Sequence, residues 1–139
     1  MRVFRPPYTY SVSMYHYNSH YNLCKRRSIA TFSYITSYRD LTLVECRDIL
    51  WPACRSTDST FFGYFLRHYP DTVSDPIKLY KCFEILICCG NITHFIYLKK
   101  YLNYDQLLSG RTHLRESHYD TRAYNQFYKL ITAEMNMRV

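Results

Sequence analysis

The chain has 139 residues, 47% of them hydrophobic and 21% charged, with a formal net charge of +7. This length predicts one domain with its own core, and the apolar content argues against wholesale disorder. No apolar run approaches the roughly 18 residues that span a bilayer, and no apolar stretch of a secretory signal follows the first residues. We therefore expect an intracellular protein, cytoplasmic or nuclear, whose six Cys stay reduced.

Residues 1–39 differ from the rest of the chain in charge. They hold six basic residues and no acidic one, whereas the other twelve basic residues share positions 40–139 with all eleven acidic ones. We expect residues 1–39 to be a loosely ordered, basic, Tyr-rich segment and residues 40–139 to form a helical domain. A basic segment without carboxylates favours contact with an anionic surface. A solvated arm with no specific target explains the same pattern.

One alternative function rests on this segment. Tyr residues alternate there with cations, and the candidate nucleic-acid contacts are Tyr17, Tyr21, Lys25, Arg26 and Arg27. Aromatic rings can stack on bases while the cations neutralise phosphates. The alternative is therefore a basic regulatory protein associated with nucleic acid.

A zinc site is the second alternative in the same segment. His16, His20 and Cys24 recur at every fourth position, which would align three ligands along one helix face. Structural zinc sites usually take their ligands as close pairs such as C-x2-C, and no such pair occurs in the sequence. The leading prediction is accordingly that the protein carries no metal and no other cofactor.

The next three elements differ in how clearly the sequence defines them. Residues 28–38 are rich in β-branched and aromatic side chains, and their length fits a strand or a helix. Residues 41–51 predict a helix that Asp40 caps and Pro52 ends. Residues 61–69 predict a second apolar helix, which ends before a Pro-Asp pair.

The strongest helix signal lies between Asp75 and Gly90. Asp75 suits the N-cap, Pro76 suits the first helical position, and Gly90 suits the left-handed residue after the last turn. The residues between them are apolar almost all round, so we expect a central helix covered on several sides, with its thiols, Cys89 included, buried.

Two further helices are predicted towards the C-terminus. An amphipathic helix begins near Phe95 and closes at Gly110, and a last one runs over residues 123–135. Short helices joined by short polar turns predict an all-α domain, either a compact bundle or stacked helical hairpins.

Catalytic signatures are missing from the sequence. It holds no G-x-S-x-G, no H-E-x-x-H and no Gly-rich phosphate loop, and only three Gly in total. Its carboxylates are mostly isolated, which fits surface charges better than an acid/base couple. We therefore predict that the protein is not an enzyme.

Part of the chain resembles ankyrin repeats, particularly the divergent repeats of large DNA viruses such as poxviruses. The run Phe83–Ile92 is similar to the end of an outer helix with the Gly and small polar residue that follow it. Thr60–Leu66 occupies the place of the inner helix, and Gly110–Leu114 looks like the opening of another repeat. The sequence shows no 33-residue period. The resemblance implies a non-enzymatic module that binds a protein through its inner helices and turns.

The run Lys81–Ile92 also resembles the Cys-rich core of the adenovirus E4 34-kilodalton proteins, which are viral ubiquitin-ligase adaptors. Together, the two resemblances imply a host-interaction adaptor, in ubiquitin ligation or immune modulation, whose partner is a host or viral protein. If the ankyrin resemblance holds, the candidate partner contacts are Phe61, Tyr64, Arg67, His68 and Arg111, because aromatic residues and Arg commonly anchor interfaces.

Overall fold

The structure is a computed structural model that describes residues 29–117 and 122–138. Every regular element in these ranges is helical, and the predicted all-α fold is confirmed for them. The α-helices are α2 (Ile29–Thr36), α3 (Leu43–Arg55), α4 (Ser59–His68), α5 (Pro76–Cys89), α6 (Ile92–Leu98), α7 (Tyr104–Ser117) and α8 (Arg122–Met137), and the 3-10 turns are η1 (Pro70–Val73) and η2 (Lys99–Tyr101).

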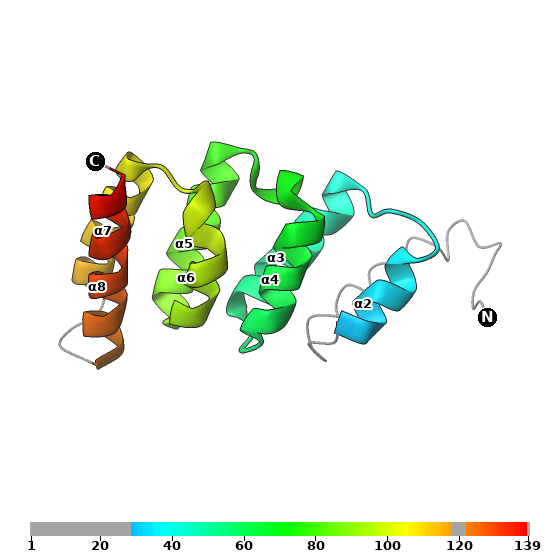
Figure 1. Cartoon of the computed structure of the whole chain (residues 1–139), viewed down its shortest axis with the longest axis horizontal. Helices are drawn as coiled ribbons and strands as arrows, with labels where there is room; N and C mark the ends of the chain where they lie inside the picture. The colour runs from blue at the N-terminus through cyan, green and yellow to red at the C-terminus, as the bar shows by residue number, and fades with distance from the viewer. Residues whose placement is uncertain (1–28, 118–121, 139) are drawn as a thin grey trace.

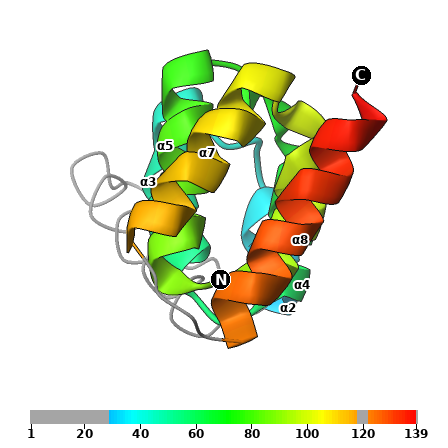
Figure 2. The same cartoon turned by 90° about the vertical axis from the view of Figure 1, so that its left-hand side faces the viewer.

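The helices stack in two layers (Figures 1 and 2). One layer contains α2, α4, α6 with η2, and α8, and we call it the even layer. The other contains α3, α5 and α7, and we call it the odd layer. Each odd helix packs against the next odd helix, α4 packs against α6, and α6 packs against α8. The molecule is thus a row of helical hairpins.

The helices of each layer recur along the chain at nearly regular intervals. Those of the even layer begin at Ile29, Ser59, Ile92 and Arg122, and those of the odd layer begin at Leu43, Pro76 and Tyr104. The spacing within each layer is roughly 30 residues, which is the length of a helical-hairpin repeat. The structure therefore has a repeat that the sequence itself does not show.

The sequence left a strand or a helix open for residues 28–38, and Ile29–Thr36 of this stretch form the helix α2. Its anchor is Phe32, which is buried and meets the rings of Phe61, Phe65 and Tyr69 edge-on at 5.6 to 5.9 Å. Edge-to-face packing suits the charge distribution of aromatic rings. Residues 29–36 of the segment predicted to be loosely ordered are thus a helix packed on α4, while residues 1–28 lie outside the described residues.

Helix α3 begins later and ends later than predicted. Its N-cap is Thr42 rather than Asp40, because Thr42 and Glu45 form a reciprocal capping box. Pro52 does not end the helix, which continues to Arg55. A Pro inside a helix costs one backbone hydrogen bond, but Ala53 and Cys54 are fully buried and their carbonyls gain partners from the start of α6. Tertiary contacts therefore stabilise the last turn of the helix, after Pro52.

Those partners are two side chains at the start of α6. The amide of Asn91 donates to the carbonyls of Cys54 and Ser56. His94 is buried, and its Nε2 lies 3.1 Å from the carbonyl oxygen of Ala53. Carbonyls at a helix C-terminus have no intrahelical partner. These hydrogen bonds therefore satisfy the end of α3 and join it to the start of α6 in the neighbouring hairpin.

Helix α5 confirms both predicted ends. The Asp75 carboxylate accepts from the N–H of Ile77, Pro76 opens the helix, and Gly90 adopts a left-handed conformation with φ of 69°. Neighbouring elements cover the helix on several sides, as predicted, but the predicted burial of its thiols was wrong for the last turn. Ile77 is 80% exposed, and Cys88 and Cys89 are both exposed. An apolar helix in a single row of hairpins is covered by its neighbours on some sides only.

The single helix predicted from Phe95 to Gly110 was wrong, because two helices occupy this stretch. The chain breaks at Leu102 and restarts where Asn103 and Gln106 exchange side-chain and backbone hydrogen bonds. Gly110 lies inside α7, not at a helix end. A side chain there would overlap the buried ring of Phe83, so close packing of α7 on α5 explains this Gly. The C-terminal helix is confirmed as α8.

Within the described residues, every helix is too short or too polar to cross a lipid bilayer.

Candidate partner-binding site

A shallow groove of about 120 Å³ lies in the even layer, where α4 meets α6 and η2. It is lined by Gly63, Leu66, Arg67, Ile96, Tyr97, Lys100 and Tyr101. The ring of Tyr97 lies directly over Gly63, so close that a Cβ on this Gly would overlap it. The absent side chain therefore lets an exposed ring form one wall of the groove. We call it the α4/α6 groove.

Next to this groove, α4 carries a cluster of Tyr64, Arg67 and His68. The rings of Tyr64 and His68 are stacked with centroids 4.2 Å apart, and the Arg67 guanidinium carbon is 5.8 Å from the Tyr64 centroid. The Tyr64 hydroxyl lies 2.9 Å from Ser33 Oγ on α2. Stacking and this hydrogen bond restrict the Tyr64 ring before any partner arrives, which lowers the entropy lost on binding.

The even layer is basic. Its helices, η2 included, contain five Lys or Arg residues and one carboxylate, namely Arg67, Lys99, Lys100, Arg122 and Lys129 against Glu134. The odd layer is nearly balanced, with Arg47, Arg55, Lys78, Lys81, Arg111 and Arg115 against Glu45, Asp48, Glu84, Asp105 and Glu116. The positive potential of these helices is thus concentrated on one side of the stack.

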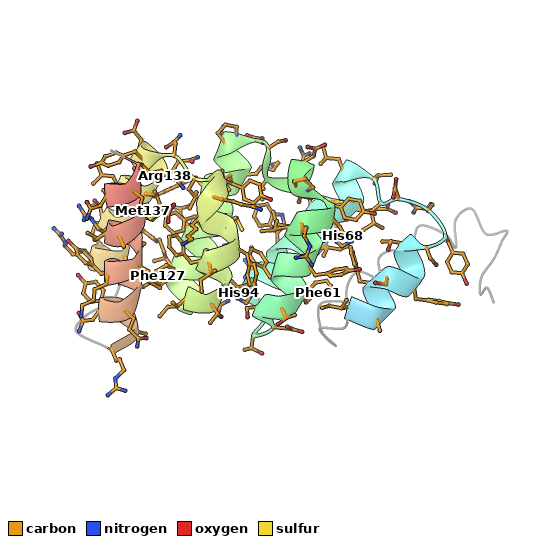
Figure 3. All side chains as sticks on the ribbon, viewed as in Figure 1. Phe61, His68, His94, Phe127, Met137 and Arg138 are labelled. Atoms are coloured by element: carbon orange, nitrogen blue, oxygen red, sulfur yellow. The ribbon has the colours of Figure 1, made fainter. Side chains whose placement is uncertain are left out.

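The single carboxylate of the even layer is already paired. Glu134 is buried, and its oxygens lie 3.4 Å from Lys99 Nζ and 2.9 Å from Arg138 Nη2. Burial acts to raise the pKa of Glu134, but the hydrogen bonds from Arg138 and Lys99 outweigh it and lower the pKa. Arg138 also donates to the carbonyls of Lys99 and Leu102, beside the C-terminal end of α8 (Figure 3). Because Glu134 is engaged by Lys99 and Arg138, no carboxylate on the helices of this layer neutralises the groove cations Arg67 and Lys100.

The structure separates the five predicted partner contacts. Tyr64, Arg67 and His68 lie together on the surface of α4. Phe61 has no exposed surface, because it lies on the side of α4 that faces α2 and packs against Phe32 (Figure 3). It cannot touch a partner, and its prediction as a contact was wrong.

Arg111 belongs to a different part of the molecule. It lies on α7 in the odd layer, donates to Thr132 Oγ1 at 2.9 Å and has its guanidinium 5.2 Å from the Tyr128 ring centroid. These contacts join α7 to α8 at the end of the row (Figure 1). Arg111 is therefore a structural link between two helices and does not share a surface with the α4 cluster.

Sequence reasoning missed the residues that α6 and η2 bring to the groove. Ile96 and Tyr97 were hidden inside a helix predicted to run on to Gly110. The break at Leu102 was the missing information, because it places Lys100 and Tyr101 at the end of a short helix beside α4.

The Cys and His residues do not assemble a metal centre within the described ranges, where no three of the His, Cys, Asp and Glu side chains converge. Cys54 and Cys82 form a buried pair with their sulfurs 2.8 Å apart, and burial together with this contact raises the pKa of Cys54. Burial also raises the pKa of Cys46 to about 11. Cys46 and Cys54 are therefore neutral thiols at physiological pH.

The alternative sites of the N-terminal segment remain predictions. The proposed zinc ligands His16, His20 and Cys24 lie outside the described residues, as do the proposed nucleic-acid contacts Tyr17, Tyr21, Lys25, Arg26 and Arg27.

The geometry of the groove is thus the main evidence on function. Comparisons with protein-family models, with curated proteins and with solved structures found no match to this chain.

Proposed function

We propose that this protein is a non-enzymatic interaction module that binds an acidic segment of a partner protein in the α4/α6 groove. The observation that carries the proposal is a groove with aromatic and apolar walls, Tyr97 and Ile96, and two cations, Arg67 and Lys100, in a layer whose only helical carboxylate is paired elsewhere. Aromatic and Arg side chains anchor interfaces, and complementary charge steers association.

An ankyrin-like architecture is part of the proposal. Two features support it, namely the alternation of the two layers and the regular recurrence of helices within each layer. In such stacks each unit packs only on its neighbours and the row presents an extended binding face. A host-interaction adaptor, viral or directed at a viral protein, is the role that this architecture and the two sequence resemblances favour.

The test is selection of random dodecapeptides on the intact protein, followed by affinity measurement. We expect the selected peptides to be enriched in Asp and Glu beside an aromatic or aliphatic residue. The double variant Arg67→Glu/Lys100→Glu should bind them about tenfold more weakly or worse, because two rim cations become repulsive.

The matched control is Lys78→Glu/Lys129→Glu. It makes the same change in net charge with two residues that do not line the groove, and it should retain binding. Peptides without acidic enrichment, or equal binding by the groove variant, would contradict the proposal. If single-stranded RNA binds through Arg67 and Lys100 while no peptide does, the nucleic-acid alternative replaces it.

A further inference from the structure

A second pocket, of about 300 Å³, opens on the odd layer where α3, α5 and α7 meet. Its lining contains two thiols, one imidazole, two cations, one carboxylate and one aliphatic side chain, namely Cys88, Cys89, His113, Arg55, Lys81, Glu84 and Ile85. We call it the thiol pocket. No part of the partner-binding proposal uses it.

Cys88 differs from the buried cysteines of the protein. Its thiol is exposed, and its sulfur lies 3.7 Å from Nε2 of His113. Cys46, Cys54 and Cys82 are all buried. A thiolate, and not a thiol, is the nucleophile, and a neighbouring imidazole that accepts the proton favours it. Cys88 therefore has both the solvent access and the base that a reactive Cys needs.

The adjacent Cys89 provides an internal comparison. It is also part of the last turn of α5, also exposed and also in the lining of the thiol pocket, but the contact of 3.7 Å with His113 Nε2 is made by the sulfur of Cys88. Cys89 therefore serves as the neighbouring thiol against which the reactivity of Cys88 can be compared.

The charges of the pocket indicate which reagents suit it. Arg55 and Lys81 face one carboxylate, that of Glu84, so the lining has an excess of one positive charge before His113 is protonated. Ile85 adds an apolar patch to the wall. Such a pocket favours a small anionic molecule, the size of a short peptide, over a neutral or cationic one.

We propose that Cys88 is a modification site that undergoes thiol–disulfide exchange with small acidic disulfides, of which glutathione disulfide is the probe. His113 takes the proton from Cys88, and the thiolate attacks one sulfur of the probe. A bond forms between Cys88 Sγ and that sulfur, the disulfide bond of the probe breaks, and the departing glutathione thiolate leaves with the electron pair and takes up the proton. The probe is the oxidant, and no further reagent is required.

The test follows the addition of glutathione to the intact protein carrying Cys24→Ser, by mass spectrometry of the whole chain and of its peptides. We expect one adduct per chain, mapped to Cys88. It should be lost in Cys88→Ser and retained in Cys89→Ser. Faster labelling of Cys89 would overturn the proposal, as would labelling of neither residue.

The role of the imidazole is tested with His113→Asn. The rate at pH 6.5 should fall about tenfold, and the difference should shrink towards pH 9, because hydroxide in solution then replaces the imidazole as the acceptor of the proton. A purely structural effect of the substitution would slow exchange equally at both pH values, and that result would contradict the role of His113.

The charge selectivity is tested by comparing glutathione disulfide with cystamine, a cationic disulfide. The protein should react faster with the anionic probe, and Arg55→Glu/Lys81→Glu should reverse the order. An unchanged order in this variant would exclude the pocket cations as determinants of the reagent.

Discussion

Each layer of the stack contains a Gly that lies under an aromatic ring of the neighbouring helix, but the two rings differ in their surroundings. In the odd layer, Gly110 of α7 lies under Phe83, which is completely buried. In the even layer, Gly63 of α4 lies under Tyr97, which is 38% exposed. The same Gly–aromatic contact is thus part of the buried core in the odd layer and part of a groove wall in the even layer.

The difference shows how one architecture separates stability from recognition. In the odd layer, the buried ring of Phe83 packs directly on Gly110 and so fixes the distance between α5 and α7. The even layer uses a partly exposed ring, and the cations of its helices outnumber their single carboxylate by five to one. Substitutions in each layer test this division.

Gly110→Ala should destabilise the protein by about 2 kcal/mol, although Ala is the better helix former by about 1 kcal/mol. The added Cβ would overlap Phe83, and the buried ring can move only by displacing other core side chains. Urea unfolding of the variant and of wild type measures the difference. The double variant Gly110→Ala/Phe83→Leu should recover part of the loss, whereas an unchanged midpoint in Gly110→Ala would show that the odd layer is not rigid.

Glu134→Gln should cost about 1–2 kcal/mol, because Lys99 and Arg138 lose their shared carboxylate. The folded state lowers the pKa of Glu134. Its contribution to stability is therefore present above the unfolded pKa, near 4.5, and is lost as pH falls through the folded value. Unfolding at pH 7 should separate wild type from variant, and unfolding at pH 3 should bring them together. The freed cations should also strengthen binding of acidic peptides to the even layer.

His94 should make stability fall between pH 7 and pH 5, by at most about 1.4 kcal/mol per pH unit. Burial lowers its pKa, against the opposing effect of the Ala53 carbonyl, so the unfolded chain binds this proton more readily. The contribution is intact above the unfolded pKa, near 6.5, and is lost below it. His94→Gln retains a donor for Ala53 and should flatten the pH profile relative to wild type. If the stability of wild type and of His94→Gln fell equally with decreasing pH, His94 would not be the group responsible for the pH dependence.

Gly63→Ala should change the free energy of unfolding by less than about 0.5 kcal/mol, because the gain in helix propensity is offset by the displacement of Tyr97. That ring is partly exposed and can rotate towards solvent, so its displacement should cost no more than the gain of about 1 kcal/mol in helix propensity. Affinity for acidic peptides should nevertheless fall, because the displaced ring alters the wall of the α4/α6 groove. A loss of stability as large as that of Gly110→Ala would erase the distinction between the layers.

Local signals in the sequence were sufficient for α5. Asp75, Pro76 and Gly90 act on the backbone within one turn, so their effect does not depend on the rest of the fold. The same local reasoning failed at Pro52, because the partners that keep α3 intact come from Asn91 and His94, far along the chain.

The candidate site was harder to predict for the same reason. Tyr64, Arg67 and His68 could be identified because they share one helix face. Phe61 could not be distinguished from them, since periodicity does not say which side of α4 meets α2. Cys88 and Cys89 occupy an apolar run that looks buried, and only the single-row arrangement of hairpins exposes them.

The hydrogen bonds from Asn91 and His94 to the end of α3 have a mechanical consequence. Together with the contacts of Arg138 with Lys99 and Leu102, they join neighbouring hairpins in series. A load applied between the two ends of such a row is transmitted through every junction, and the weakest junction yields first. Under tension the chain should lengthen in successive steps, each the release of one hairpin, rather than in one all-or-none rupture.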